Sequence, residues 1–424
     1  MIDIRSIWFH DNIWALAIEC STPGDKLPFF RGHIDTEIDN NVLNQIEHLI
    51  IGIALYEPQL KGDYTPWLED CLKFCKESNM FPNLKSVHVL YETASIKFSK
   101  LTDYYPIYGS RVRFFLLRSD DTEKKSIGID HSKQWSFNRN KKALWMLGDI
   151  TNRPHKFPLL YKFFVEDEMD RLDYSLTYVL NACQPNQFQE ETYSMLLDWM
   201  NGLYDLDLDL AKMKELYFKF ARSFEGDQFG EMALKKLHAF DLANYVFPPQ
   251  YNNASLIINP ETWWRHPAQG VYPEDNMVFP VTEKTWKPIA VKKPFIGISV
   301  QDTFEKTLES LGFRTFRKYT CHPELVDFGE GYIAEDLEKY INVAYERVTS
   351  FLDCCDEHQD EIWQDIEHNH NQWKIVLERE WDLLFQGCPP LKHVPKIKIL
   401  RLFTVPFLTT INSEEARNHL IFGY

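Results

Sequence analysis

Residues 279–299, FPVTEKTWKPIAVKKPFIGIS, have side chains whose types and spacing suit the binding of an anion. Thr282 is a good N-cap for a helix that begins at Glu283, and we expect the N–H groups of the next three residues to be unpaired at the positive end of the helix dipole. Lys284 and Lys287 are three residues apart on one helical face, where either ammonium could neutralise a phosphate. The segment therefore predicts a diphosphate site.

Glu283 has two interpretations. A carboxylate in the first helical turn complements the dipole and contributes roughly 0.3–1 kcal/mol, or it accepts hydrogen bonds from the hydroxyls of a ribose or a sugar. The local charge favours an anionic ligand, because residues 280–320 contain eight Lys or Arg against four Asp or Glu, whereas residues 321–382 contain four against seventeen. A cationic island is thus predicted in a chain whose formal charge is −16.

The same segment resembles a family of glycosyltransferases found in tailed bacteriophages and large DNA viruses. The similarity is carried by Glu261 in SLIINPET, Thr282-Glu283-Lys284-Thr285, Lys287-Pro288, Pro294-Phe295 and Leu311-Gly312-Phe313-Arg314-Thr315-Phe316. Val291-Lys292-Lys293 departs from the family, in which glycine is common at this turn. Weaker similarities extend the resemblance to about half of the chain: LGDITNRPHKFPLLY with Arg153, IEHNHNQW at 366–373, and Tyr56-Glu57-Pro58.

This resemblance implies an α/β protein of GT-B architecture, with two Rossmann-like doubly wound domains facing a cleft. The C-terminal domain would bind a nucleoside diphosphate sugar as donor substrate, and the N-terminal domain would bind the acceptor. No resident cofactor and no metal are expected. Similar Glu and Lys residues in fucosyltransferase-like enzymes hold the ribose and diphosphate of the donor, and the residues expected on the donor side here are Arg153, Glu261, Thr282, Glu283, Lys284 and Lys287.

The resemblance agrees with the chemistry of such a transfer. A nucleoside diphosphate leaves with developing negative charge, which Lys284, Arg153 and a helix N-terminus could stabilise. An inverting transfer also needs an Asp, Glu or His near the acceptor hydroxyl as general base. Glu57 ranks first because of its Glu-Pro similarity, while His10, Asp11 and Glu92 also end or follow N-terminal strands. A retaining enzyme would need no such base.

The acceptor is not specified by these residues. The resemblance favours a hydroxymethylated pyrimidine in phage DNA, with a glycan or protein acceptor as the alternative. A DNA acceptor requires a local basic groove, for which RFFLLR and NRNKK supply pieces. Two other classes stay open: a non-catalytic sugar- or nucleotide-binding protein of the same fold, and a helical interaction module on an α/β core. The protein is expected to act as a monomer or a homodimer.

Composition excludes several other classes. The 424 residues are 44% hydrophobic and 25% charged, which is typical of a compact globular protein and not of a disordered one. The net charge argues against a generally basic nucleic-acid coat. No run of about 18 apolar residues predicts a membrane span, and the first residues lack the features of a secretion signal, so a cytoplasmic protein is expected. Eight cysteines scattered over this length do not indicate a disulfide framework.

Other motifs have simpler interpretations. Asp205, Asp207 and Asp209 imitate the metal-binding Asp-x-Asp of another glycosyltransferase fold, but they precede AKMKEL and are interpreted as solvated carboxylates at a helix start. A second group matches no closed zinc pattern and is predicted to be structural or exposed: Cys354, Cys355, His358, His368 and His370. Cys71 and Cys75, four residues apart, are expected on the buried face of a helix. The glycine motifs of P-loops and dinucleotide-binding folds are missing from the sequence.

Alternating apolar runs and helical periodicity predict the elements that must position these residues. Strands are expected at 2–9, 13–18, 48–55, 84–91, 112–117, 143–147, 174–180, 255–259, 294–299 and 313–317, and helices near 67–75, 155–167, 283–291, 303–311, 333–351 and 362–384. Gly312 is predicted to end a helix in the left-handed conformation. A polar linker is expected at 119–142 and a helical insertion at 190–243. The predicted domains are 1–135, 136–355 and a C-terminal helix and tail at 356–424, which we expect to pack on the N-terminal domain.

Overall fold

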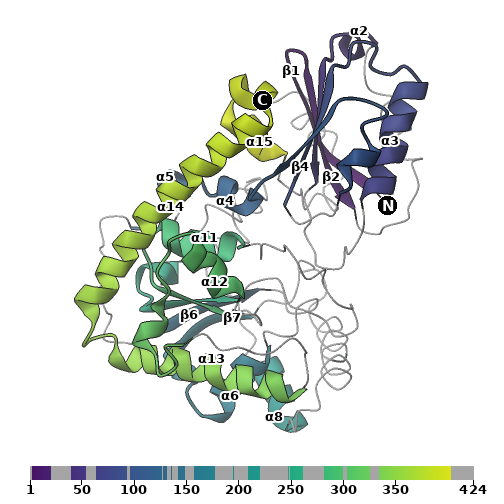
Figure 1. Cartoon of the computed structure of the whole chain (residues 1–424). Coiled ribbons are helices and arrows are strands. Elements are labelled where there is room, and N and C mark those ends of the chain that lie inside the picture. The colour runs from purple at the N-terminus through teal and green to yellow at the C-terminus, as the bar shows by residue number, and fades with distance from the viewer. Residues whose placement is uncertain are drawn as a thin grey trace. The chain divides into compact units, whose positions relative to one another are not determined.

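The chain folds into two compact units, each with its own sheet (Figure 1). The computed structural model describes residues 2–20, 40–53, 64–92, 96–126, 128–130, 135, 142–148, 157–176, 194, 209–219, 247, 249–260, 281–298, 303–324 and 334–402. Unit 1 consists of Met1–Arg118, Tyr272–Pro280 and Leu377–Tyr424, and unit 2 of Ser119–Val271 and Val281–Val376. The first division lies at the start of the segment in which the sequence predicts a linker. The C-terminal residues from 377 cluster with unit 1.

The sheet of unit 1 has five strands in the order in which they occur along the chain. Its strands are β1 (Ile2–His10), β2 (Ile13–Cys20), β3 (His48–Ile53), β4 (Ser86–Tyr91) and β5 (Ile107–Arg111). β1 and β2 form an antiparallel hairpin, and β2 to β5 are parallel. The apolar runs of β3 and β4 are almost wholly buried, as expected for parallel strands that are covered on both faces.

Helix α3 (Thr65–Glu77) packs on this sheet through one apolar face. Leu68, Leu72 and Cys75 are spaced four and three residues apart, and all three are buried in the same cluster as Val87 and Val89 of the strands. The prediction that Cys71 and Cys75 lie on a buried helical face is confirmed, since both side chains are buried free thiols.

The predicted strand at 112–117 is wrong. The edge strand is β5, whose sequence IYGSR carries little apolar signal, and the apolar residues after it form the short helix α4 (Phe114–Arg118). Every side chain of α4 is buried. A short apolar run buried on all sides has the same composition whether it is a strand or a helix, so periodicity could not separate the two.

The sheet of unit 2 has four parallel strands in the order β7-β6-β8-β9. They are β6 (Ala143–Gly148), β7 (Leu172–Leu176), β8 (Leu256–Pro260) and β9 (Phe295–Ile298). Helix α6 (Phe157–Val165) follows β6, α11 (Glu283–Ala290) connects β8 to β9, and α12 (Thr303–Ser310) follows β9. The sequence-based prediction of an α/β protein is therefore confirmed, and parallel strands dominate both sheets. The described strands of unit 1 follow chain order, so its sheet lacks the reversal that defines a doubly wound fold and differs from the prediction of two doubly wound domains.

The expected strand at 313–317 is also wrong. Residues Phe316–Tyr319 form a 3₁₀ helix, η6, and Phe313 and Phe316 are buried without joining the sheet. Their rings instead pack against Trp286 of α11 and Phe295 of β9, with centroid distances of 5.6 Å in each case. Packing of aromatic rings on the face of the sheet buries these residues as effectively as strand pairing.

Two long helices follow, α13 (Ala334–Cys354) and α14 (Gln359–Gly387), as helical spacing predicts. In α14, Trp373 is buried and its indole N–H donates to Ser119 Oγ at 2.8 Å, which joins this helix to the start of unit 2. The predicted insertion at 190–243 lies mostly outside the described residues, which include α8 (Leu210–Lys219). The remaining elements are α2 (Asn40–Leu43), η1 (Phe98–Lys100), α5 (Thr122–Lys125), η3 (Met169–Arg171), η4 (Pro249–Asn252), η7 (Pro389–His393) and α15 (Lys396–Arg401).

In the part of the chain that the structure describes, each helix is too short or too polar to cross a bilayer.

Gly312 offers a test of local backbone geometry. It has φ = +87°, confirming the predicted left-handed helix end, and an added Cβ would lie 2.7 Å from Nε2 of Gln372, which donates to the Leu311 carbonyl at 2.6 Å.

We expect Gly312→Ala to lower the free energy of unfolding by roughly 1–2 kcal/mol, because a side chain is unfavourable in this conformation. Urea denaturation measures the change. Gly312→Asn should cost less, since Asn adopts positive φ more readily, and an alanine variant as stable as the wild type would contradict this explanation.

Candidate functional site

The strand order of unit 2 creates a topological switch point between β6 and β8. The chain passes from β6 to β7 on one side and later places β8 and β9 on the other side of β6. Connections that leave neighbouring parallel strands in opposite directions open a crevice beyond their carboxyl ends, where ligands bind in open α/β sheets. The candidate site therefore lies at the carboxyl edge of this sheet, after Gly148 of β6 and Pro260 of β8.

Asn259 marks this edge. It is the penultimate residue of β8, its side chain is only 2% exposed, and its Nδ2 has no hydrogen-bond partner among the described residues. A buried amide N–H without a partner costs about 1–3 kcal/mol, so its position at a switch point is typical of a group that binds a ligand. No motif in the sequence indicated a role for Asn259. The available signal was a lone polar residue at the end of the apolar strand LIIN.

The N-terminus of α11 belongs to the same edge. β8 and β9 are parallel and α11 lies between them in the chain, in contact with both, so the helix runs back along the sheet and begins at its carboxyl edge. Thr282 is confirmed as the N-cap: its backbone is extended (φ −87°, ψ 178°), and its Oγ1 accepts the N–H of Lys284 at 3.4 Å. The sequence thus predicted both the helix and its start.

The expectation of unpaired amides at Glu283, Lys284 and Thr285 is wrong for Lys284 and Thr285. Besides the Lys284 amide, the N–H groups of Thr285 and Trp286 donate to the carbonyl oxygen of Thr282, at 3.1 and 3.3 Å. The cap residue satisfies these donors because both its hydroxyl and its carbonyl face the first turn. An anion bound here would therefore depend on the helix dipole and on side chains more than on free amides.

The two predicted phosphate-binding lysines have different surroundings. Lys284 is half-buried, whereas Lys287 is buried and its ammonium lies 4.5 Å from the centroid of the Phe247 ring. That distance is typical of a cation–π contact. The ring thus gives Lys287 a partner within unit 2. Lys284 is the more exposed of the two, so a ligand phosphate would reach its ammonium more readily.

Four of the eight basic side chains in the cationic island predicted at 280–320 form ion pairs with carboxylates that the structure describes. The side chain of Asp365 in α14 is 2% exposed. Its carboxylate oxygens lie 2.9 Å from Nη1 of Arg314 and 2.7 Å from Nζ of Lys318. Burial opposes ionisation of Asp365, but hydrogen bonds from Lys318, Arg314 and Tyr319 hold the pKa of this carboxyl below its ordinary value. Further pairs join Lys292 to Glu367 and Arg317 to Glu305.

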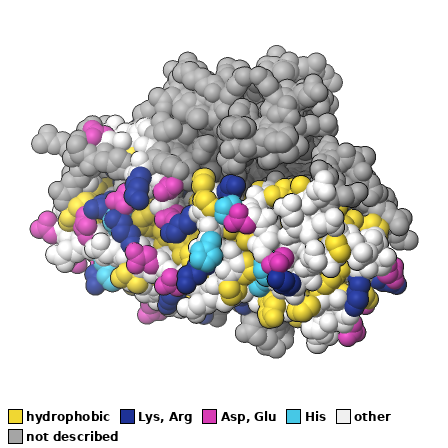
Figure 2. All heavy atoms as spheres, turned by 90° about the horizontal axis from the view of Figure 1, so that it is seen from above, with side chains coloured by type: hydrophobic (Ala, Val, Ile, Leu, Met, Phe, Trp, Pro, Cys, Tyr) yellow, Lys and Arg dark blue, Asp and Glu magenta, His cyan; other side chains and the backbone are white. Residues whose placement is uncertain are grey.

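These pairs show why a local count of charge misleads. The acidic partners Asp365 and Glu367 come from α14, about 50 to 75 residues away in the chain. On the face shown in Figure 2, basic and acidic side chains are likewise interspersed among the described residues. The net charge of a window is therefore a poor guide to the field that a ligand would meet.

Other predicted site residues lie where the structure gives no side-chain positions. Glu57, Arg153 and Glu261 are outside the described residues, and Glu283 is described only through its backbone as the first residue of α11. In chain order, Arg153 follows β6 and Glu261 follows β8, the two strands of the switch point. Their placement at the site stays a prediction.

The candidates for a general base in unit 1 lie at opposite edges of its sheet. His10 ends β1 and Asp11 lies in the turn that leads to Ile13, the first residue of β2. Both therefore lie at the amino edge of the parallel strands. Glu92 directly follows β4 and lies at the carboxyl edge, where ligands of α/β sheets bind. Among the described candidates, Glu92 is thus the one that the topology favours, and Glu57, ranked first from the sequence, is outside the described residues.

Glu92 also has an unusual acidity. Its side chain is 7% exposed, and burial raises the pKa of its carboxyl to about 8. The nearby Glu380 adds to this effect, while the backbone N–H of Phe114 and the charges of Arg113 and Arg111 oppose it. Arg113 donates two hydrogen bonds to the carboxylate of Glu380, from its backbone N–H at 2.9 Å and from its guanidinium at 2.8 Å. A buried carboxyl with a strongly raised pKa at such an edge is a typical acid–base candidate.

Comparison with protein-family models and with curated proteins finds no match to this chain.

Glu92 predicts a pH dependence of stability. Because its pKa in the folded state is above the ordinary value of 4.5, the folded protein keeps a proton that the unfolded chain releases. Stability should therefore fall as the pH rises from about 4.5 to about 8. Glu92→Gln keeps the neutral shape and should remove this slope, making the variant more stable than the wild type at pH 8.5 by about 2–4 kcal/mol.

Chemical denaturation at several pH values measures this difference. The matched control is Glu378→Gln, which changes an exposed carboxyl of the same helix that contains Glu380. It should leave the pH profile unchanged. Parallel profiles for Glu92→Gln and the wild type would show that Glu92 is ionised normally.

Proposed function

We propose that this protein is a GT-B-type glycosyltransferase that moves a sugar from a nucleoside diphosphate sugar to an acceptor hydroxyl. The observation that carries the proposal is the position of Thr282. It caps a helix that begins at the carboxyl edge of a parallel sheet, and it opens the Thr-Glu-Lys-Thr segment that resembles the family motif. The motif and the ligand-binding edge of the fold thus coincide, although they were identified independently.

Unit 2 is proposed to bind the donor. The ammonium of Lys284 and the dipole of α11 favour the diphosphate, and they favour it more as the glycosidic bond breaks and the leaving group gains charge. The amide of Asn259, which has no hydrogen-bond partner among the described residues, supplies a donor for a phosphate or ribose oxygen. Glu261, Glu283 and Arg153 keep the donor-side roles that the resemblance implies, with Lys287 supporting the site through its charge.

Unit 1 is proposed to supply the base. In an inverting transfer, the carboxylate of Glu92 would take the proton of the acceptor hydroxyl while that oxygen forms a bond to the anomeric carbon. The bond from this carbon to the phosphate oxygen breaks, and its electron pair leaves with the nucleoside diphosphate. A base with a pKa of about 8 is well matched to this proton transfer.

Lys284 provides the direct test of donor binding. We expect the purified protein, offered a panel of nucleoside diphosphate sugars, to release nucleoside diphosphate slowly from one of them, with water as the acceptor. Lys284→Ala should reduce this release by about 100-fold, the usual loss for one electrostatic contact to a leaving group. Lys339→Ala, which changes an exposed lysine of α13, is the control and should behave as the wild type. Equal rates for Lys284→Ala and Lys339→Ala would contradict the assigned site.

Glu92 should control the pH dependence of transfer. With the donor identified, kcat/KM is expected to rise with pH and to level off above about 8, because the ionised carboxylate is the active form. Glu92→Gln should lose at least about 100-fold in kcat and keep its affinity for the donor. An unchanged kcat in this variant would exclude Glu92 as the base, and Glu57 would then be the preferred candidate for the general base.

The proposed acceptor is a hydroxymethylated pyrimidine in phage DNA, with a glycan or a protein as the alternative. The resemblance supports the first choice. The interspersed charges in Figure 2 give no preference for DNA on that face. Mass spectrometry of nucleosides and glycans from cells that make the wild-type protein or Glu283→Ala would distinguish the acceptors.

A non-catalytic sugar- or nucleotide-binding protein of the same fold is the second candidate. The observation that favours it is the pairing of Arg314, Lys318 and Lys292 with carboxylates of α14, which leaves fewer cations to stabilise a leaving diphosphate. Such a protein would bind a sugar nucleotide without releasing the nucleoside diphosphate in the presence of any acceptor. Calorimetry combined with the release assay separates the two candidates.

A further inference from the structure

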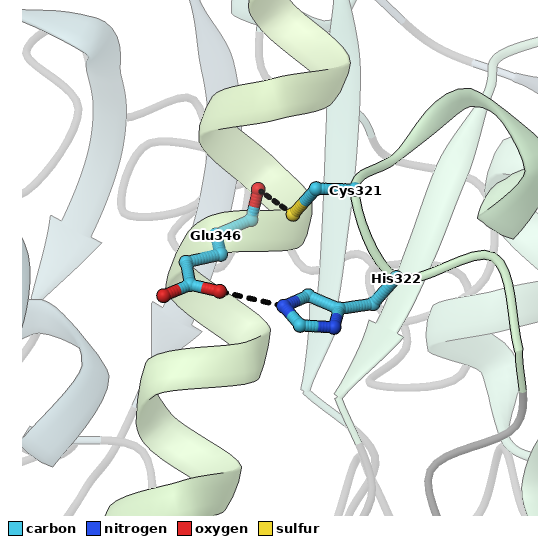
Figure 3. Close-up of side chains that lie close together, drawn as sticks. All are labelled: Cys321, His322 and Glu346. Atoms are coloured by element: carbon cyan, nitrogen blue, oxygen red, sulfur yellow. Dashed lines mark hydrogen bonds and ion pairs between the residues drawn. The ribbon is translucent and has the colours of Figure 1, made fainter.

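A thiol, an imidazole and a carboxylate converge on one side of α13 (Figure 3). Cys321 and His322 lie in the loop after η6, and Glu346 projects from the helix toward them. His322 Nε2 is 2.6 Å from Glu346 Oε2, and the ligand atoms of the three residues all lie within 4.8 Å of one another. The three side chains thus occupy the vertices of a small triangle.

The loop is attached to the same helix by other contacts. The backbone N–H of Cys321 donates to Ser350 Oγ at 3.0 Å, and Arg347 donates to the carbonyl of Glu324 at 2.8 Å. The Cys354 thiol donates to the carbonyl of Tyr319 at 2.9 Å. Contacts before, within and after the Cys321–His322 pair therefore position it against α13, so little ordering is needed for these residues to bind an ion together.

We propose that Cys321, His322 and Glu346 form a zinc site. Zn²⁺ binds Cys sulfur at about 2.3 Å and His nitrogen or carboxylate oxygen at about 2.0–2.2 Å, so ligands of one tetrahedral ion are separated by about 3–4 Å. Small side-chain rotations bring the present triangle to that size. A thiolate and an imidazole select zinc over Mg²⁺ or Ca²⁺, which prefer oxygen ligands.

Binding has a defined proton and charge balance. The Cys321 thiol releases its proton to solvent and gives up its contact with the Glu346 carbonyl, 3.5 Å away. The proton between His322 Nε2 and Glu346 Oε2 is exchanged through solvent for one on Nδ1, so that the neutral ring turns the lone pair of Nε2 to the metal. The thiolate and the Glu346 carboxylate then carry two negative charges against the two positive charges of the ion. Three protein ligands leave the fourth position for water.

The side chains of His322 and Glu346 are 34% and 51% exposed, and Cys321 is exposed as well. Solvent can therefore reach the ion, which makes the site exchangeable. Sequence spacing could not indicate it, because adjacent Cys and His followed by a Glu 24 residues later match no zinc motif. This site goes beyond the proposed transfer reaction and adds a metal where the sequence-based expectation was none.

Cobalt is the sharpest probe, because Co²⁺ occupies zinc sites and a thiolate ligand gives it a charge-transfer absorption in the near ultraviolet. We expect one equivalent of Co²⁺ to produce this absorption in the wild-type protein, and Zn²⁺ to abolish it. Cys321→Ser should lack the absorption and bind Zn²⁺ at least about 100-fold more weakly, and Glu346→Gln should also weaken binding. Because Zn²⁺ would cover the thiol, it should also protect Cys321 of the wild type from alkylation, as read by peptide mass spectrometry.

The matched control is His358→Ala. His358 and Glu361 form a comparable exposed pair at 3.5 Å, which does not belong to a three-ligand group among the described residues. This variant should keep the absorption and the zinc affinity. A wild-type protein without the thiolate absorption, an absorption retained in Cys321→Ser, or alkylation of wild-type Cys321 unaffected by Zn²⁺ would each overturn the proposal. The alkylation measurement needs no variant, so it decides the matter even if Cys321→Ser fails to fold.

Discussion

The parallel pairing of β6, β8 and β9 is the constraint on which the candidate site depends. Parallel strands must be joined by crossovers, so each helix between them begins at the carboxyl edge of the sheet. This topology, and no single hydrogen bond, brings the end of β8 and the start of α11 to the same edge. Asn259 and Thr282 are 23 residues apart in the chain and share this edge because β8 and β9 run in the same direction.

Two buried carboxyls show how the surroundings decide acidity. Asp365 and Glu92 are both almost inaccessible, and burial opposes ionisation in each. Asp365 is held in the charged form by two cations and a tyrosine hydroxyl, whereas Glu92 has a second carboxyl, Glu380, nearby. The first is suited to holding η6 and the residues just before it against α14, and the second to moving a proton.

The zinc proposal and the transfer proposal concern different parts of unit 2. The candidate site is defined by the carboxyl edge of the sheet, which is a property of the fold, whereas Cys321, His322 and Glu346 meet through a loop attached to one helix. The contacts of Ser350 and Arg347 with that loop have no role in the proposed transfer chemistry. They do explain why the loop is positioned on α13 with or without a metal.

By itself, the sequence determined the α/β class, most helices and the capped start of α11, because periodicity and capping are local properties of the chain. The sequence-based prediction was wrong where burial decided between a strand and a helix, as for the helix that begins at Phe114 and the 3₁₀ helix that begins at Phe316. Only the tertiary structure decided the strand order, the acidity of Glu92, the pairing of Arg314 and Lys318 with Asp365 and the proximity of Cys321 to Glu346. Each of these is set by residues distant in sequence, whose proximity no local pattern encodes.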